Sequence, residues 1–290
     1  MEILETLING LSSGGTYAMI ALGYTMVYGI AKMLNFAHGD IIMVGGYMIF
    51  VTMATLGNPI LGLVAACVFC VALGVGIEKV AYKPLRGASP LAVLITAIGV
   101  SYLLQSTAQM IFGTAPKMVV ISNLGNVQLW GLKIPIYILI TLICSFAIML
   151  VLSLFVKYTR TGRAMIAVSE DRAAAQLMGI NVNRIIMITF AIGSALAAVA
   201  GFFMLMKSPS LSNTLGAMPG IKAFTAAVIG GIGSIPGAMV GGVLLGVVEA
   251  ISYKIPEIAP YTDAIEFMIL IVILLVRPTG ILGKKRREKV

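Results

Sequence analysis

Residues 221–250 read IKAFTAAVIGGIGSIPGAMVGGVLLGVVEA, an apolar run that is too long for one membrane crossing and is broken near its middle. About 20 apolar residues suffice for a helix to cross the hydrocarbon core of a bilayer. A proline removes a backbone donor and breaks a helix, and several glycines precede the proline of this run. We therefore predict two helical arms joined at residues 230–237, with the turn either inside the membrane or at its cytoplasmic face. The residues assigned to this turn are Gly230, Gly231, Gly233, Pro236 and Gly237.

The rest of the chain is equally apolar. Of its 290 residues, 59% are hydrophobic and only 11% are charged, whereas about a quarter of the residues of a soluble domain are charged. This composition predicts an all-α polytopic membrane protein, with residues 1–290 forming a single transmembrane domain and no soluble domain. The apolar segments are expected at about 7–30, 41–56, 59–78, 90–113, 135–156, 185–206, 221–251 and 261–276.

The basic residues predict the orientation of the chain, because cytoplasmic loops carry an excess of Lys and Arg. Four stretches hold one, three, five and six basic residues, which makes 15 of the 20 in the chain, and we assign them to the cytoplasm. The N-terminus, with Glu2 and Glu5, is then outside and the C-terminus inside. The net charge of +9 follows from this topology and from contact with anionic lipids, so no nucleic acid is expected as a partner. The four stretches are residues 31–40, 79–89, 157–184 and 277–290.

The sequence LNFAHGD, residues 34–40, holds the only histidine of the chain. A metal site needs three or four ligands, and His38 and Asp40 supply two, so no metal is expected. His38 could act as a base, but no serine motif marks a nucleophile for it, so no catalytic residues are assigned and an intramembrane hydrolase is an unsupported alternative. The favoured interpretation is a break between two membrane helices at Asn35, His38, Gly39 and Asp40. A turn at the cytoplasmic face is the alternative. Non-helical backbone at membrane depth must be covered by protein or line an aqueous cavity, so this break and the turn at 230–237 are expected near a transport path.

A short helix is predicted within the polar loop of residues 157–184, in the sequence VSEDRAAAQLMGINVNR. Ser169 can cap its start, Glu170 and Asp171 complement the positive end of its dipole, and Gly179 can end it. A helix of about nine residues is not stable alone. It therefore either docks on a partner protein or rests on the membrane surface as a connector.

The chain carries no G-x-x-x-x-G-K-[ST] phosphate-binding motif, so it is not expected to hydrolyse ATP by that route. If the chain moves a solute, the energy comes from another subunit or from an ion gradient. A secondary carrier or channel is thus an alternative to a subunit of an ATP-driven transporter.

Several stretches together resemble one family. They are MLNFAHGDIIMVGGY, IEKVAYKPLRGASPLAVLITAIGVSYLLQ, IFGTAPK, TGRAMIAVSEDRAAAQLMGINVNRII, PGIKAFTAAVIGGIGSIPGAMVGG and LLVRPTGILG. In this order they cover nearly the whole chain and resemble the permease subunits of branched-chain amino acid ABC importers, most closely the shorter, LivH-type of the two paralogous permeases.

The resemblance implies a multi-pass protein of the bacterial plasma (inner) membrane that imports leucine, isoleucine or valine. It implies a second, paralogous permease, two cytoplasmic ATPase subunits that bind the ATP, and an extracytoplasmic amino-acid-binding protein, with no cofactor on the permease itself. Related permeases serve urea, other amino acids or small amides, so the substrate stays open. The resemblance also implies that SEDRAAAQLMGI is the loop that couples to the ATPase, with the residues Glu170, Asp171, Arg172, Ala174 and Gly179.

Overall fold

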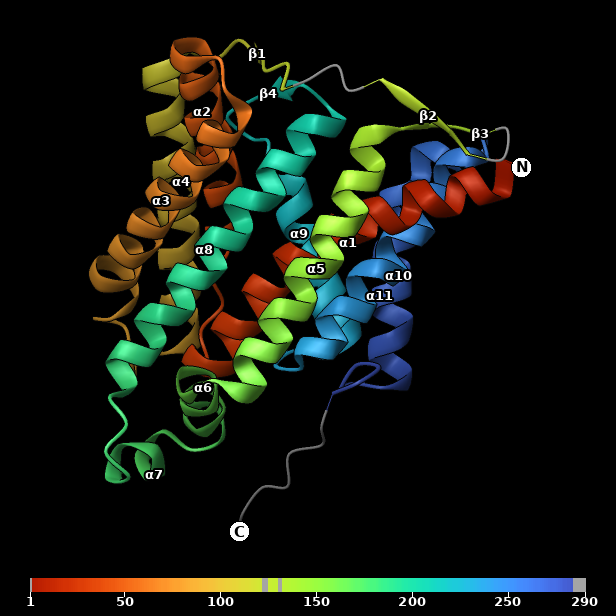
Figure 1. Cartoon of the computed structure of the whole chain (residues 1–290). Coiled ribbons are helices and arrows are strands. Elements are labelled where there is room, and N and C mark those ends of the chain that lie inside the picture. The colour runs from red at the N-terminus through yellow and green to blue at the C-terminus, as the bar shows by residue number, and fades with distance from the viewer. Residues whose placement is uncertain (1, 122–124, 130–131, 284–290) are drawn as a thin grey trace.

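The computed structural model of the chain describes residues 2–121, 125–129 and 132–283 and is a bundle of helices with two small pairs of strands (Figure 1). The helices are α1 (Glu2–Ala31), α2 (His38–Leu56), α3 (Pro59–Ile77), η1 (Glu78–Tyr82), α4 (Pro90–Phe112), α5 (Ile136–Tyr158), α6 (Arg160–Glu170), α7 (Arg172–Leu177), α8 (Val182–Lys207), α9 (Ala217–Gly230), α10 (Ile235–Lys254), η2 (Ala259–Tyr261) and α11 (Thr262–Val276). The strands are β1 (Lys117–Met118), β2 (Asn126–Leu129), β3 (Leu132–Pro135) and β4 (Ser210–Leu211).

Within the described residues, seven helices are long and apolar enough to cross a membrane: α2, α3 with η1, α4, α5, α8, α10, and η2 with α11. Helix α9 is a shorter apolar helix. The predicted all-α membrane fold is confirmed. The predicted segment 7–30 lies in α1, which is not among the seven although it has 30 residues. Most residues of α1 from Gly10 onward are buried among other helices, so the Gly, Ser and Thr residues there need not be compatible with lipid.

Local sequence signals explain where several helices begin. The side chains of Asn58, Ser89 and Ser234 accept hydrogen bonds from backbone N–H groups in the first turns of α3, α4 and α10. In each case a proline occupies one of the first two helical positions, where its missing N–H costs nothing. A polar cap followed by proline therefore marks the start of three helices that are otherwise almost uniformly apolar.

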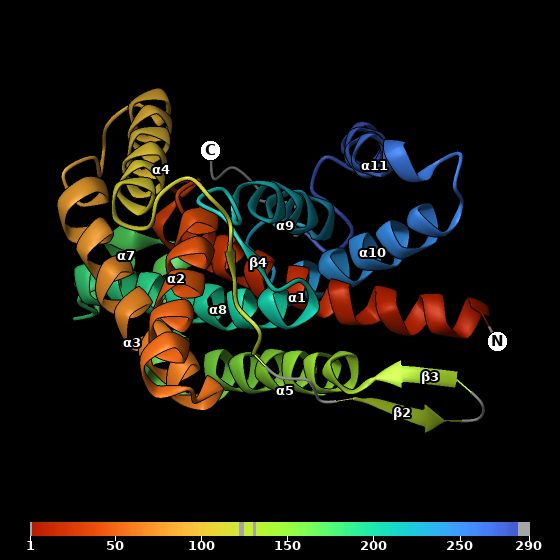
Figure 2. The ribbon, with the colours of Figure 1, turned by 90° about the horizontal axis from the view of Figure 1, so that it is seen from above.

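Helix α1 lies in the middle of the bundle, between α5 on one side and α9 and α10 on the other (Figure 2). Its closest neighbour is α10. A Cβ atom added at Gly242 or Gly246 of α10 would overlap the backbone of Ala18 or Gly14 of α1. Small residues at spacings of four let helix backbones approach this closely, and in lipid such contacts stabilise helix pairs by van der Waals packing. Gly242 and Gly246 are thus used for packing against α1, while Gly241 packs against the backbone of Ala226 in α9.

The two ends of the bundle differ. Helices α6 and α7 lie at one end, which we call the α6–α7 end (Figure 1). At the opposite end β1 pairs with β4 and β2 pairs with β3, both antiparallel. Helices α9 and α10 form an antiparallel hairpin whose turn lies next to the end of α1, since Gly233 faces Gly29. The two arms predicted for residues 221–251 are confirmed, and their turn lies towards the α6–α7 end.

Candidate functional site

A helix break is present at residues 32–37; of the residues predicted for it, Asn35 lies in the break, whereas His38, Gly39 and Asp40 form the first turn of α2. Helix α1 ends at Ala31, and Lys32 adopts a left-handed conformation with φ of 53° that turns the chain out of the helix. The following residues are not helical until α2 begins at His38. Asn35, His38 and Asp40 are each at most 3% exposed, so the segment is covered by protein. Asn35 and the start of α2 therefore lie inside the protein, while the position of this segment relative to the membrane faces stays a prediction.

Hydrogen bonds hold the polar residues of this break in place. The Tyr82 hydroxyl of η1 donates to Oδ1 of Asn35 at 2.9 Å, and Nε2 of Gln105 in α4 donates to Oδ1 of Asp40 at 2.8 Å. The first bond is between two buried side chains, where an unmade bond would be costly, and the second joins buried Asp40 to the half-buried Gln105. The break is thereby tied to two helices that flank it.

His38 occupies a tight pocket in the core. Its ring lies edge-on to Tyr24, with ring centroids 4.7 Å apart, and a Cβ atom at Gly23 would overlap it. Its Nε2 is buried and has no hydrogen-bond partner within the described part of the chain. In residues 2–121, 125–129 and 132–283 no group of three or more His, Cys, Asp or Glu residues is placed to hold a metal ion. The position of His38 is that of a packed core residue at the start of a helix.

The start of α2 meets the start of α9 inside the bundle. A Cβ atom at Gly39 would lie 2.5 Å from the carbonyl oxygen of Gly216 and 3.4 Å from Cα of Gly220. Helix α9 begins at Ala217, so the first turns of two interrupted helices touch through backbone atoms. Membrane transporters use such interrupted helices to line substrate paths. The role of Asn35, His38, Gly39 and Asp40 in transport stays a prediction.

The second predicted break, at residues 230–237, is a tight turn with two left-handed glycines. Gly231 has φ of 109° and Gly233 has φ of 92°, a region that L-residues with a side chain rarely adopt. Oγ of Ser234 accepts a hydrogen bond from the Gly237 N–H at 3.2 Å and caps α10, in which Pro236 is one of the first residues. The carbonyl of Gly230 accepts a bond from the Leu282 N–H at 2.9 Å, so the turn also anchors the segment after α11.

The two breaks share a narrow gap without merging into one site. Asn35 and Ile232 line this gap together with Tyr28 and Phe224. His38 to Asp40 lie farther along the bundle, against α9. The structure therefore brings Asn35 close to the turn at 230–237 and places the other residues of the first break away from it.

The loop of residues 157–184 folds into two helices, and one part of its prediction is wrong. Ser169 does not cap the short helix; it lies within α6, where its hydroxyl donates to the Ile166 carbonyl at 2.7 Å. The cap is Asp171, whose Oδ1 accepts hydrogen bonds from the N–H groups of Ala173 and Ala174 at 2.9 and 3.0 Å. Helix α6 continues through Glu170 because Met165 and Val168 bury one of its faces in the bundle. The short helix α7 consequently has six residues instead of about nine.

Helix α7 is attached to the bundle at one side and open at the other. Arg172 donates from Nη2 to the carbonyl of Ile30, at the end of α1, at 3.0 Å. Burial and the positive charge of Arg86 lower the pKa of Arg172. Leu177 and Met178 are 89% and 83% exposed, and Gly179 follows with φ of 83°. Glu170 and Ala174 are exposed as well, so the predicted coupling residues lie on or beside one protruding element.

An ionic network that the sequence reasoning missed lies among α1, α9, α10 and α11. Nζ of Lys222 lies 2.9 Å from Oε1 of Glu249, 2.8 Å from Oδ1 of Asp263 and 3.3 Å from Oε2 of Glu266. The Tyr17 hydroxyl donates to Oε1 of Glu249 at 2.8 Å. The available signal was the presence of Lys and Glu inside apolar segments, since such residues pair or face the interior of a membrane protein.

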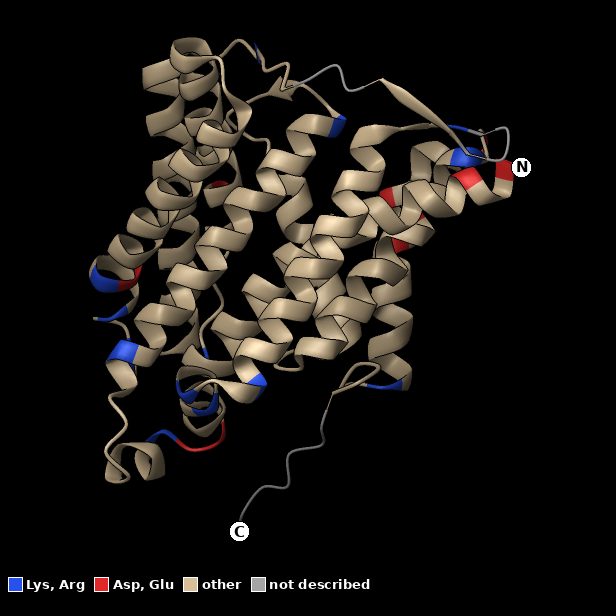
Figure 3. Ribbon diagram, in the orientation of Figure 1, with Lys and Arg blue, Asp and Glu red and all other residues tan. Residues whose placement is uncertain are grey.

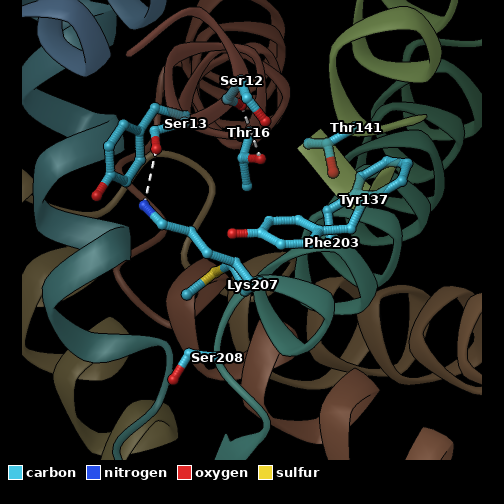
Figure 4. Close-up of a pocket in the computed structure, with 10 residues that line it drawn as sticks. Ser12, Ser13, Thr16, Tyr137, Thr141, Phe203, Lys207 and Ser208 are labelled. Atoms are coloured by element: carbon cyan, nitrogen blue, oxygen red, sulfur yellow. Dashed lines mark hydrogen bonds between the residues drawn. The ribbon is translucent and has the colours of Figure 1, made fainter. Parts of the chain in front are cut away.

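A cavity of about 200 Å³, lined by both polar and apolar side chains, lies between α1, α5 and α8 (Figure 4). It is at the end of the bundle opposite α6 and α7, because the first turns of α5 and the last turn of α8 line it. No sequence pattern indicated this cavity, because its residues come from three segments that are far apart in the chain. They are Ser12, Ser13, Thr16, Tyr17, Tyr137, Thr141, Phe203, Met204, Lys207 and Ser208.

Comparisons with known proteins agree with this architecture. Residues 6–274 match the family described as "Branched-chain amino acid transport system / permease component". The chain is 44% identical over 308 aligned positions to the high-affinity branched-chain amino acid transport system permease protein LivH of Escherichia coli (strain K12), covering 100% of this chain and 98% of that protein. It is also 44% identical over 301 positions to the corresponding permease BraD of Pseudomonas aeruginosa, covering 99% of this chain and 98% of that protein.

A match over this length shows the family of the chain. The members of this family are transport components rather than enzymes, in agreement with the prediction that the chain has no enzymatic activity of its own. The predicted likeness to LivH-type permeases is confirmed by both relatives. The chain is a multi-pass membrane protein that belongs to the family of branched-chain amino acid transport system permease components.

Proposed function

We propose that the chain is the permease of an ATP-driven importer that moves leucine, isoleucine and valine across a bacterial inner membrane. It pairs with a second, related permease, takes its substrate from an extracytoplasmic binding protein and is driven by two cytoplasmic ATPase subunits. The names of its full-length relatives support the substrate class. A substrate such as urea or another small amino acid or amide is the alternative, and competition with labelled leucine uptake tests it.

The α6–α7 end faces the cytoplasm in this proposal. Lys and Arg residues gather at that end, around α6, α7 and the neighbouring helix ends, while few lie at the opposite end (Figure 3). An excess of basic residues on one side is typical of the cytoplasmic side of a membrane protein. The N-terminus, with Glu2 and Glu5, is then extracytoplasmic, and the segment after α11 is cytoplasmic.

The observation that carries the proposal is the protruding helix α7. Six residues are too few for a helix that is stable without neighbours, yet Leu177 and Met178 at its end are almost fully exposed. Large apolar side chains that leave the membrane region and protrude into water are typical of a surface that another protein covers. The cap at Asp171 fixes the start of α7 and leaves its free end available to an ATPase subunit.

Movement of α7 has a direct route to the helix break. Arg172 contacts the backbone of Ile30, two residues before the chain leaves α1, and α6 packs against α1, α5 and α8. Closure of the ATPase pair would displace α7, and this contact would carry the displacement to residues 32–40. The opening step of the importer is thus placed, in our proposal, at the junction of α1 and α2.

The test is to replace Leu177 by aspartate and Ala174 by tryptophan in the importer assembled with its partner subunits. Both positions are exposed, so insertion and folding should persist while capture of the ATPase subunits and ATP-driven leucine uptake are lost. Met118→Asp is a matched control, because Met118 is 69% exposed at the opposite end. Normal uptake by both α7 variants would refute the docking role. Uptake that continues without ATP but stops with a proton-motive uncoupler would identify a secondary carrier instead.

A further inference from the structure

We infer that the cavity between α1, α5 and α8 binds one free amino acid, with its carboxylate at Lys207 and Ser13 and its ammonium at the hydroxyls of Ser12 and Thr141. This inference rests on the proposed function, from which it takes the substrate class. It adds the place where the permease holds the substrate on the side at which a binding protein would deliver it.

The cavity offers one cation that lacks an anionic partner. Nζ of Lys207 donates to Oγ of Ser13 at 2.8 Å (Figure 4), and no carboxylate of the described residues pairs with it. A lysine ammonium has three donors, so two stay available to a ligand. A carboxylate seated here would accept charge-assisted hydrogen bonds, which are shorter and stronger than those between neutral groups.

Ser12 and Thr141 supply hydroxyl groups that can accept hydrogen bonds on other walls of the cavity. Ser12 is 7% and Thr141 3% exposed, both line the cavity, and no side-chain hydrogen bond of either hydroxyl is found within residues 2–121, 125–129 and 132–283. Neither oxygen is among the fully buried atoms, so both are open to water or a ligand in the cavity. Each can accept a hydrogen bond from an ammonium group. Cation and acceptors on different walls are the arrangement that an amino acid zwitterion requires.

Helical spacing explains how three segments build one site. The pairs Ser12 and Thr16 on α1, Tyr137 and Thr141 on α5, and Phe203 and Lys207 on α8 are each four residues apart, so each pair lies on one face of its helix. Phe203 is buried one turn before Lys207 and gives the cavity an apolar wall for an aliphatic side chain.

The volume of the cavity limits its ligand. At about 200 Å³ the cavity is below the roughly 300–1,000 Å³ of pockets that hold drug-sized ligands, so it fits one small metabolite and no peptide. Tyr17 also lines it, and its hydroxyl donates to Glu249 of the ionic network. The side chain of Tyr17 therefore connects a ligand in the cavity with the network formed by α9, α10 and α11.

The first experiment measures ATP-driven leucine uptake by the complete importer with Lys207→Met, Lys207→Arg and Thr141→Val. Loss of the charge should lower the maximal uptake rate by about 10- to 100-fold, and loss of the neutral hydroxyl by about 2- to 10-fold. The apparent KM should stay unchanged because the binding protein sets it, and Lys207→Arg should keep most of the rate. Lys254→Met is the control, since Lys254 pairs with Glu2 outside the cavity.

A second measurement probes binding without transport. In the full chain with Cys67, Cys70 and Cys144 replaced by alanine, Ser13→Cys should react with a membrane-impermeant thiol reagent. L-leucine should slow this reaction, whereas L-leucinamide, which lacks the carboxylate, should not.

The two proposals fail in different ways. An importer whose wild-type chain does not take up leucine with ATP would refute the proposed function. An importer that does so, but keeps the wild-type rate with Lys207→Met and Thr141→Val, would overturn the cavity alone. Absent labelling of Ser13→Cys, or labelling that leucine does not slow, would overturn it as well.

Discussion

Replacing Gly14 by alanine is expected to weaken the packing of α1 against α10. A Cβ atom at this position would lie 2.8 Å from Cα of Val243, 3.0 Å from its carbonyl oxygen and 3.1 Å from the carbonyl oxygen of Gly242. All three are backbone atoms of α10, which cannot rotate away as the end of a flexible side chain could. The added methyl group can fit only if the two helices separate.

The size of the effect follows from these distances. Ordinary van der Waals contact begins near 3.4 Å, so the backbones must separate by about 0.6 Å, the difference from 2.8 Å. A radial gap of about 0.5–1 Å forfeits a quarter to a half of the dispersion attraction of each contact along the interface. Inserting a methyl group into a packed core costs about 1–3 kcal/mol, and the better helix propensity of alanine returns about 0.5–1 kcal/mol. We expect a net loss of about 1–2 kcal/mol.

The measurement is the free energy of unfolding in mixed micelles, titrated with SDS and followed by circular dichroism. Gly99→Ala in α4 is the matched control, because a Cβ atom there has no neighbour within 4 Å. The control should be as stable as the parent chain or slightly more stable. Equal stability of Gly14→Ala and Gly99→Ala would refute the reasoning that the backbone contact of α1 with α10 limits the size of residue 14.

The same unfolding measurement tests Lys222→Met and Tyr82→Phe, whereas amide exchange and uptake test Asp171→Ala. Lys222→Met should cost about 3–5 kcal/mol, because it leaves buried carboxylates without their cation; Lys157→Met, at an exposed position, should cost little. Asp171→Ala should cost α7 about 0.5–2 kcal/mol through the lost cap, seen as faster amide exchange of that helix and lower leucine uptake. Tyr82→Phe should cost about 1–3 kcal/mol, because it leaves Oδ1 of Asn35 buried without its donor; an unchanged free energy would contradict it.

The coupling loop shows where a local interpretation can fail. Ser169 and Asp171 are both good cap residues two positions apart, and sequence preference alone does not choose between them. The choice is made by the apolar face of α6, where Met165 and Val168 pack into the bundle and extend that helix past Ser169. Tertiary packing therefore moved the start of α7 by two residues and shortened it.

The site residues divide in the same way. The break at Asn35 and the turn at 230–237 could be predicted because Asn, Gly and Pro interrupt an apolar pattern over a few neighbouring residues, although Gly39, assigned to the break, is part of α2. The contact of Gly39 with Gly216 could not be predicted, because 177 positions separate them and only the packing of α2 on α9 joins them.

Hydrophobicity, basic loops and helix caps are properties of short segments, and they determined that this chain is an all-helical membrane protein with a hairpin at residues 221–251 and a short helix in its longest basic loop. The ionic network of Lys222 and the cavity at Lys207 were decided by tertiary structure alone. Each is built from side chains on three or four helices, and the distances between these side chains depend on how closely the helix backbones approach and on the rotation of each helix. The distance between helix backbones is set by many weak contacts over the whole bundle, so it cannot be predicted from any local sequence pattern.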